Sequence, residues 1–314
     1  MTISVTGLRK SFGDHVVLDG IDLTVQPGTV FSLLGANGAG KTTTVKILST
    51  LHKADAGEAK VAGYDVDREP DAVRAAIGVT GQFSAVDKLL TGEENLRLMA
   101  DLHQLSRAEG RQRAARLLER FDLIDAARKP AATYSGGMLR RLDLAMTLVG
   151  SPRVIFLDEP TSGLDPRSRR EMWQIVRDLV ADGVTIFLTT QYLEEADELA
   201  DRIAVLDGGR VVAEGTAEEL KRRIPGGHVR LQFTDEHQLD AARLALPEAT
   251  REGEGLALRV PGDGSLTALK TLIDRLDERA VKVDGMSVHT PDLDDVFLAL
   301  TGKPTETPTE KVTN

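Results

Sequence analysis

Four largely apolar runs of strand length occur in the first two thirds of the chain, and segments with helical spacing lie between them. The runs cover residues 30–34, 154–157, 184–189 and 203–206. Short continuous apolar runs are typical of strands buried on both faces. Apolar residues recur at helical spacing through 91–125, 139–148 and 172–180. Strands that alternate with helices predict an α/β fold with a mainly parallel core sheet.

Other patterns predict smaller elements around this sheet. Residues 1–25 alternate apolar and polar positions, which favours antiparallel strands, with turns at Gly13-Asp14 and at Gly20. Residues 57–66 are typical of an edge strand with a turn, and 77–82 of a short strand that ends in Gln82. The sequence Asp207-Gly208-Gly209 between two apolar runs predicts a hairpin. We therefore expect an antiparallel β subdomain and a helical subdomain at about 88–150.

The pattern restarts after Pro225-Gly226-Gly227, which we interpret as a linker. Strand patterns follow at 228–233, 256–260 and 281–288, with helical patterns at about 238–245, 265–277 and 293–300. The prediction is a first domain over residues 1–224 and a small α+β domain over 225–302. Residues 303–314 are rich in Thr, Pro, Glu and Lys and are expected to be disordered.

A phosphate-binding loop follows the first apolar run. Residues 35–42 have the spacing of a glycine, four residues and then Gly-Lys-Thr, between a strand and a helix start. The glycines allow left-handed dihedrals and close approach to an anion, and the loop N–H groups and helix N-terminus attract it. Lys41 is expected to bridge the β- and γ-phosphates of a nucleotide, and the Thr42 hydroxyl to ligate Mg²⁺. The predicted binding residues of this loop are Gly35, Ala36, Asn37, Gly38, Ala39, Gly40, Lys41, Thr42 and Thr43.

Two acidic residues follow the second apolar run. Asp158 ends that strand, where its carboxylate can reach the Mg²⁺ shell. Glu159 comes next, and a carboxylate there can orient and deprotonate an attacking water. The pair therefore predicts a hydrolytic site beside the phosphate loop.

Ser135-Gly136-Gly137 opens a helix, and two interpretations of it stay open. It is either a capped helix after a flexible turn or a second anion-binding surface. Such an anion-binding surface cannot easily contact a nucleotide that already fills the phosphate loop of the same chain. A second copy, placed head to tail, can offer its Ser135 helix to that nucleotide, which gives two composite sites. Phe12 has a similar ambiguity, since it suits a core aromatic and a platform for adenine about equally.

Taken together, these motifs resemble those of the ATPase subunit of an ABC transporter, over residues 1 to about 220. Residues 35–43 match Walker A, Gln82 the Q-loop, 134–138 the signature, 154–159 Walker B and 163–165 the D-loop. The resemblance implies hydrolysis of ATP by a sandwiched dimer that drives a membrane partner. It also implies adenine stacking on Phe12, contacts of the signature with ATP, and a metal site of Thr42, Gln82 and Asp158. Glu159, Gln82 and Gln191 are its implied catalytic residues.

This sequence departs from the family pattern at three positions. Tyr134 and Met138 stand at the ends of the signature, usually written LSGGQ. Gln191 occupies the switch position, where most of the family has histidine. A glutamine can donate a hydrogen bond to the γ-phosphate but cannot become cationic, so the rate of hydrolysis stays open.

Residues 189–197 and 294–302 resemble a subgroup, the ATPases of daunorubicin/doxorubicin-resistance exporters. This resemblance implies efflux of drugs or secondary metabolites, such as anthracycline-like antibiotics, through a separate multi-span permease. In this subgroup the C-terminal domain is expected to help assembly with the permease. The permease contacts the cargo, so this sequence does not specify it.

Composition and hydropathy limit the partners and the cellular location of the protein. The net charge of −10 without a long basic run argues against a nucleic-acid partner, and the absence of cysteine excludes thiolate chemistry. No apolar run approaches the roughly 18 residues of a spanning helix, so any membrane role must come through a partner, and the resemblance implies a peripheral place on the cytoplasmic membrane face. The alternative is a soluble ABC ATPase of translation or DNA repair, although such proteins usually carry two cassettes or long insertions. A P-loop kinase or GTPase would leave Ser135-Gly136-Gly137 without a role.

Overall fold

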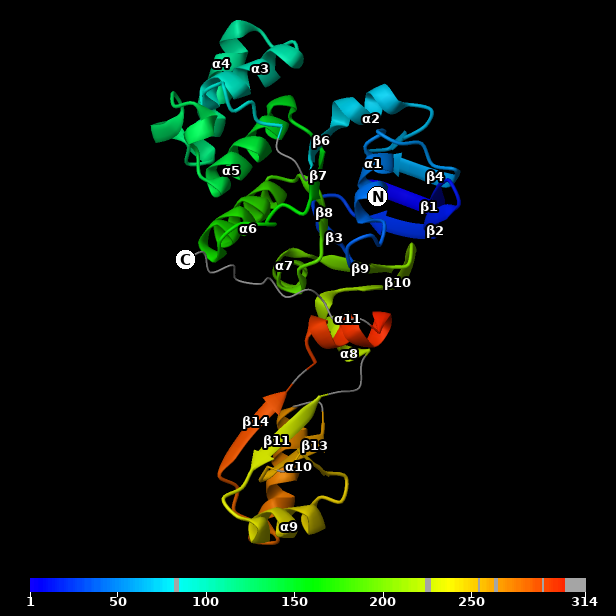
Figure 1. Cartoon of the computed structure of the whole chain (residues 1–314), viewed down its shortest axis with the longest axis vertical. Coiled ribbons are helices and arrows are strands. Elements are labelled where there is room, and N and C mark those ends of the chain that lie inside the picture. The colour runs from blue at the N-terminus through cyan, green and yellow to red at the C-terminus, as the bar shows by residue number, and fades with distance from the viewer. Residues whose placement is uncertain (82–84, 224–226, 254, 263–264, 290, 303–314) are drawn as a thin grey trace. The chain divides into compact units, whose positions relative to one another are not determined.

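The computed structural model describes residues 1–81, 85–223, 227–253, 255–262, 265–289 and 291–302 (Figure 1). The chain divides into two compact units, Met1–Ala217 and Glu218–Pro304. The division falls within the residues of helix α8 (Ala217–Arg222), whereas the sequence pattern placed the domain boundary after residue 224. Within the described ranges, no helix is both long enough and apolar enough to cross a membrane.

A six-stranded sheet forms the centre of the first unit, in the order β10-β9-β3-β8-β7-β6. Five of its strands are parallel and β10 is antiparallel at one edge. This arrangement confirms the predicted parallel core sheet. The strands are β3 (Val30–Leu34), β6 (Ile77–Thr80), β7 (Val154–Asp158), β8 (Thr185–Thr190), β9 (Arg202–Asp207) and β10 (Arg210–Gly215).

Burial on both faces explains why the central strands are continuous apolar runs. Every residue of β3, β7 and β8 is buried. Successive residues of β7 belong to different cores, with Ile155 in the core on one face and Phe156 in the core on the other. The ring of Phe156 lies 5.5 Å from that of Phe187, which in turn stacks 5.5 Å from Phe31. A polar residue at these positions would leave an unsatisfied group in a core.

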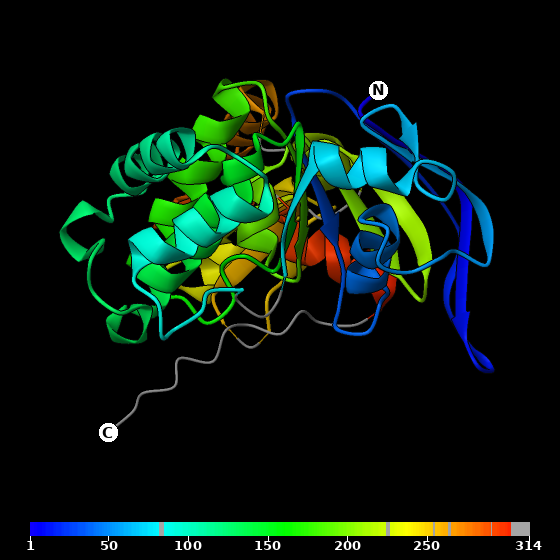
Figure 2. The same ribbon diagram turned by 90° about the horizontal axis from the view of Figure 1, so that it is seen from above.

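Helices cover both faces of this sheet (Figures 1 and 2). Helices α3, α4, α5 and α6 gather on one side, and α1 and α2 lie on the other. The single helical pattern at 91–125 contains two helices, because Thr91 with Glu94 and Ser106 with Glu109 each form a capping box that starts a helix. The helices are α1 (Lys41–Leu48), α2 (Pro70–Ala76), α3 (Gly92–Leu102), α4 (Arg107–Arg120), α5 (Gly136–Thr147), α6 (Pro166–Ala181) and α7 (Leu193–Leu199). Three short 3-10 helices cover Ile124–Ala126, Ala131–Thr133 and Leu148–Gly150.

A separate antiparallel sheet has the order β2-β1-β4-β5. Its strands are β1 (Ile3–Phe12), β2 (His15–Val25), β4 (Ala56–Val61) and β5 (Tyr64–Asp65). The turn predicted at Gly20 is wrong, because Gly20 lies inside β2. Its φ of +76° occurs where the register between β1 and β2 shifts, so this glycine serves an irregularity of the strand pair.

The second unit packs two helices against one face of an antiparallel sheet of order β12-β13-β11-β14. Its elements after α8 are β11 (His228–Gln232), α9 (Glu236–Ala245), β12 (Thr250–Arg251), β13 (Ala257–Pro261), α10 (Leu266–Asp277), β14 (Gly285–His289) and α11 (Leu293–Thr301). The strand predicted from residue 281 begins only at Gly285. Val281 instead closes the end of α10, where its N–H donates to Leu276 O.

Candidate nucleotide-binding site

Three neighbouring strands of the core sheet end at one edge, and each is followed by predicted site residues. The order β3-β8-β7 places the end of β8 between the ends of the other two strands. Leu34 pairs with Thr190, and Asp158 pairs with Thr189. Because these strands are parallel, the loop after β3, Gln191 after β8 and Glu159 after β7 start from one edge of the sheet.

The phosphate loop requires glycine at two positions for steric reasons. A Cβ on Gly35 would lie 2.5 Å from the carbonyl oxygen of Leu206. A Cβ on Gly40 would lie 2.6 Å from the Leu18 side chain, and Gly40 has a φ of +111°. Gly40 immediately precedes α1, so the loop leads directly into a helix N-terminus. The backbone of this loop therefore packs closer to its neighbours than any side chain would allow.

Lys41 is held inside the loop. Its side chain is 3% exposed, and Nζ donates hydrogen bonds to Gly35 O at 2.8 Å and Ala36 O at 3.1 Å. Nζ also lies 3.5 Å from the carboxylate of Glu159. Burial lowers the pKa of Lys41, and the nearby Glu159 carboxylate opposes that shift. The structure thus brings together the predicted phosphate-binding lysine and the predicted catalytic carboxylate.

Thr42 and Asp158 also meet. The Thr42 hydroxyl donates to Asp158 Oδ1 at 3.3 Å, and the Thr189 hydroxyl donates to the same oxygen. A hydroxyl and a buried carboxylate that converge offer the oxygen ligands that Mg²⁺ prefers, with phosphates and water completing its shell. The residues present therefore fit a magnesium ion. Thr43, the next residue of α1, is half-buried.

Glu159 is held in an unusual backbone conformation. Its φ is +50°, a left-handed value that costs a residue other than glycine roughly 1 kcal/mol or more. Its N–H donates to Thr189 O at 3.0 Å, and its carboxylate accepts from Ser162 Oγ at 3.2 Å. Strain of this kind concentrates at functional sites. The neighbouring strand β8 fixes this backbone, so the carboxylate has a defined place.

Ser135 caps helix α5. Its Oγ accepts a hydrogen bond from Met138 N at 3.2 Å, and Gly136 and Gly137 form the first turn. A Cβ on Gly137 would lie 2.7 Å from Ser168 Oγ, so the second glycine serves close packing against α6. No hydrogen bond or ion pair joins residues 135–137 to residues 35–43 in the part of the chain that the structure describes. The two motifs thus remain separate within one chain.

Arg140, on the same helix, reaches the loop that contains Glu159 (residues 158–160, the catalytic loop), and no sequence motif marks this arginine. Its guanidinium donates to Pro160 O at 2.8 Å, Gly81 O at 2.9 Å and Asp158 O at 3.2 Å. It also forms an ion pair with Asp143 Oδ2 at 3.4 Å, and the other carboxylate oxygen of Asp143 accepts a hydrogen bond from Ala85 N at 3.0 Å. Its only sequence signal is a charge within a helical series. Helix α5 therefore contacts both residues that flank Glu159, as well as Gly81 and Ala85. Gln82 lies outside the described residues.

Glu195 on α7 is a second residue that the sequence analysis missed. It is fully buried, and its Oε1 accepts from Thr161 Oγ1 at 2.7 Å and from Trp173 Nε1 at 3.3 Å. Burial raises the pKa of Glu195, against the effect of these hydrogen bonds. The carboxyl joins the loop after Glu159 to the helix that follows Gln191. Gln191 is half-buried, directly after β8.

Two aromatic residues of the predicted motifs have clear surroundings. Phe12 ends β1 and is 47% exposed, with Lys10 Nζ 5.3 Å from its ring centroid, so its interpretation as a core residue is wrong. Tyr134, at the start of the signature, is buried, and its hydroxyl donates to Ala126 O at 2.7 Å. Burial raises the pKa of Tyr134. This departure from the family pattern is therefore a packing feature with a satisfied hydroxyl.

Comparison with known proteins identifies the family. Residues 18–162 match the sequence profile of the ABC transporter family. The chain is 51% identical over 302 residues to the daunorubicin resistance ATP-binding protein DrrA3 of Streptomyces coeruleorubidus, across 96% of both chains. The chain belongs to the family of ABC transporter ATP-binding proteins. It is also 47% identical to the doxorubicin resistance ATP-binding protein DrrA of Mycobacterium tuberculosis, over 99% of this chain and 97% of that one.

A solved ABC cassette supports the same assignment. A dimeric ATP-binding cassette in a post-hydrolysis state, with ADP and phosphate bound, aligns with a TM-score of 0.62 and 27% identity. The alignment covers 68% of this chain and 98% of that cassette. Membership confirms the ABC ATPase fold and an ATP-binding, ATP-hydrolysing subunit of a transporter. The comparisons give no support to a role in translation or DNA repair.

Proposed function

We propose that this ABC ATPase powers the efflux of drugs or secondary metabolites, such as anthracycline-like antibiotics, through a separate multi-span permease. The main support is the DrrA3 relative, a daunorubicin resistance ATP-binding protein that aligns across 96% of this chain. An alignment over 96% of this chain must include most of the second unit, so the similarity extends beyond the ATP-binding cassette. The chain acts at the cytoplasmic face of the membrane, where the permease holds it.

We propose the following roles for the site residues in ATP hydrolysis, which the geometry described above supports. Residues 35–43 enclose the phosphates, with Lys41 on the β- and γ-phosphates and Phe12 against adenine. Thr42, Asp158 and Gln82 would hold Mg²⁺, which would neutralise phosphate charge there. Glu159 takes a proton from the attacking water, as its fixed backbone and its position 3.5 Å from Lys41 Nζ allow.

The switch position acts without a cationic side chain. Gln191 donates a hydrogen bond to the γ-phosphate, which requires only its amide. Its place directly after β8, beside the strand that holds Glu159, supports this role. Gln191→His is therefore expected to hydrolyse ATP at least as fast. An inactive Gln191→His enzyme would show that the glutamine is specifically required.

A second copy of the chain completes each nucleotide-binding site. The capped N-terminus of α5, with Ser135, Gly136 and Gly137, contributes N–H groups to the γ-phosphate held by the partner copy. This helix has no bond to its own phosphate loop among the described residues, which suits a role in trans. The dimeric cassette with ADP and phosphate supports the dimerisation that this arrangement requires.

The experiment is efflux from cells that co-express the chain with a candidate multi-span permease, using doxorubicin as the probe. Wild type should lower cell-retained doxorubicin and appear in the membrane fraction. Glu159→Gln should stay in that fraction and lose efflux. Glu119→Gln, an exposed change on α4, is the control and should retain efflux. A chain that never reaches membranes with any such partner would contradict the proposal, as would efflux that Glu159→Gln leaves intact.

A further inference from the structure

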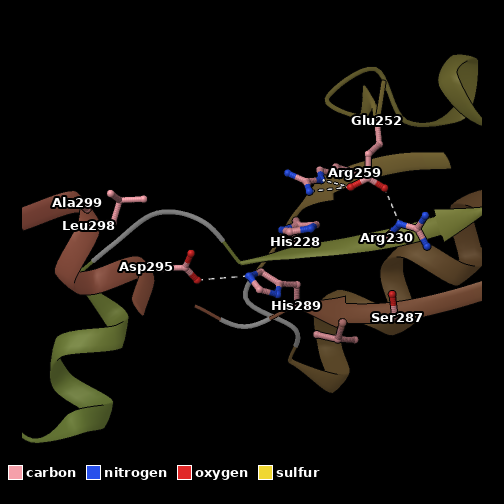
Figure 3. Close-up of a pocket in the computed structure, with 10 residues that line it drawn as sticks. His228, Arg230, Glu252, Arg259, Ser287, His289, Asp295, Leu298 and Ala299 are labelled. Atoms are coloured by element: carbon pink, nitrogen blue, oxygen red, sulfur yellow. Dashed lines mark hydrogen bonds and ion pairs between the residues drawn. The ribbon is translucent and has the colours of Figure 1, made fainter. Parts of the chain in front are cut away.

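One face of the sheet in the second unit carries an unusual set of polar side chains. Val229 and Leu231 of β11 point into the core against α9 and α10. Side chains alternate along a strand, so His228 and Arg230 point to the opposite face. Directly paired residues on the neighbouring strands share that face, which brings Arg259, Ser287 and His289 beside them (Figure 3).

The register places like residues opposite one another. Arg230 pairs directly with Arg259, and His228 pairs directly with His289, with ring centroids 4.7 Å apart. Like charges at directly opposed positions destabilise a sheet. Folding of this unit does not require them, because its core lies on the other face. An anionic ligand bound by the two guanidinium groups would offset this repulsion.

Glu252 balances only part of this charge. It accepts hydrogen bonds from the Nε atoms of both Arg230 and Arg259, and these bonds lower the pKa of Glu252. The two terminal amino groups of Arg230 bond to no residue in the described ranges. Figure 3 shows these groups turned away from Glu252. Two guanidinium groups share a single carboxylate, so donors remain for an anion.

The same residues line a cavity of about 590 Å³, a volume suited to a small molecule. Helix α11 closes one side with Asp295, Leu298 and Ala299. His289 Nε2 lies 3.4 Å from Asp295 Oδ2, which orients the ring. The cavity thus combines guanidinium and imidazole donors, the Ser287 hydroxyl and a short apolar wall.

We propose that this cavity binds a small molecule bearing a phosphoryl group. A guanidinium offers paired N–H donors that match phosphate oxygens, and Ser287 adds a hydroxyl donor. A phosphoryl group has three terminal oxygens, enough to accept from Arg230, Ser287 and an imidazole together, whereas a carboxylate has two. Glu252 is the internal counter-ion that the ligand competes with. The group can belong to a soluble organic phosphate or to a lipid headgroup.

The test follows the side-chain nitrogen signals of His228 and His289 by NMR in the ¹⁵N-histidine-labelled full chain. These signals report on the cavity itself, so phosphate at the ATP site does not confuse the result. Assignment uses His228→Gln and His289→Gln. Inorganic phosphate and glycerol 3-phosphate should shift both signals saturably below about 10 mM, which corresponds to a few kcal/mol of binding. Acetate at equal ionic strength should shift them far less.

Variants separate a binding role from a structural one by the sign of their effect. Arg230→Gln should weaken phosphate binding at least tenfold, and Glu252→Gln should tighten it several-fold by removing the competing charge. Arg243→Gln, on α9 outside the cavity, is the matched control and should bind as wild type does. Circular dichroism melting verifies folding. Glu252→Gln keeps the test decisive if Arg230→Gln does not fold.

Vesicles distinguish the two sources of the phosphoryl group. Phosphatidic acid vesicles that broaden both histidine signals, while phosphatidylcholine vesicles do not, would assign a lipid headgroup. Shifts with soluble phosphates alone would assign a free metabolite. The proposal is overturned if no phosphate source affects the two signals, if acetate acts equally, or if Glu252→Gln weakens binding.

Discussion

Replacement of Arg140 by alanine tests whether helix α5 holds the catalytic loop. The guanidinium is largely buried, with its side chain 11% exposed. The change removes hydrogen bonds to Pro160 O, Gly81 O and Asp158 O, and it removes the ion pair between Arg140 and the Asp143 carboxylate, which is 3% exposed. Removing one member of a buried ion pair costs about 3–5 kcal/mol. We expect a loss of this size from a unit whose total stability is of the order of 5–15 kcal/mol.

The single tryptophan makes the assay specific to the first unit. Trp173 lies on α6, is 5% exposed and donates to Glu195, so its fluorescence reports unfolding there. Urea titration of wild type and Arg140→Ala should show the midpoint shift. Arg141→Ala is the matched control on the same helix: its side chain is 16% exposed, close to that of Arg140, but it pairs with an Asp122 carboxylate that is 95% exposed. Such pairs contribute less than about 1 kcal/mol.

Arg140→Lys refines the test, since an ammonium keeps the charge beside Asp143 but lacks the planar fork that reaches separate carbonyls. Its stability should lie between those of wild type and Arg140→Ala. Equal stability of Arg140→Ala and Arg141→Ala would refute the reasoning, because it would mean that the three carbonyls and Asp143 do not depend on the guanidinium.

Other predictions concern the site directly. Glu159→Gln should lower the steady-state ATPase rate by about 10²–10⁴-fold, the usual contribution of a general base, with nucleotide affinity retained; an unchanged rate would remove Glu159 from that role. Gly40→Ala should abolish ATP binding measured by calorimetry, because Gly40 has a φ of +111° and its Cβ would lie 2.6 Å from Leu18 and 3.0 Å from Val17 O. Gly262→Ala is the control, because Gly262 has open space around its Cβ position and no left-handed φ, and it should bind ATP normally. Burial raises the pKa of Glu195, so the native state keeps a proton that the unfolded state releases, and wild-type stability falls as pH rises through that interval. Glu195→Gln should therefore gain stability relative to wild type as pH rises, and a difference independent of pH in urea titrations would contradict this.

The sequence predicted what depends on short-range pattern. Strands β3, β7 and β8 are buried on both faces, so their apolar runs stood out, and the residues that follow them lie at one end of the sheet because parallel strands end together. Phosphate-loop residues were recognisable because their geometry restricts the residue types, as at Gly35 and Gly40.

Long-range contacts account for what the sequence did not reveal. Arg140 and Glu195 look like ordinary charges of amphipathic helices, and only tertiary packing brings them to the carbonyls of the catalytic loop and to Thr161. The opposition of Arg230 and Arg259 depends on strand register, which residues 29 positions apart do not specify by themselves. Gly20 was mistaken for a turn because a strand irregularity also favours glycine.

The composite nucleotide site is the central claim, and sedimentation velocity of the Glu159→Gln protein tests it most directly. With Mg²⁺ and ATP this protein should sediment as a dimer, and with ADP as a monomer. Adding Ser135→Arg, which places a bulky cation at the N-terminus of α5, should keep it monomeric while ATP still binds. A Ser135→Arg, Glu159→Gln protein that dimerises with ATP as readily as Glu159→Gln alone would contradict the account.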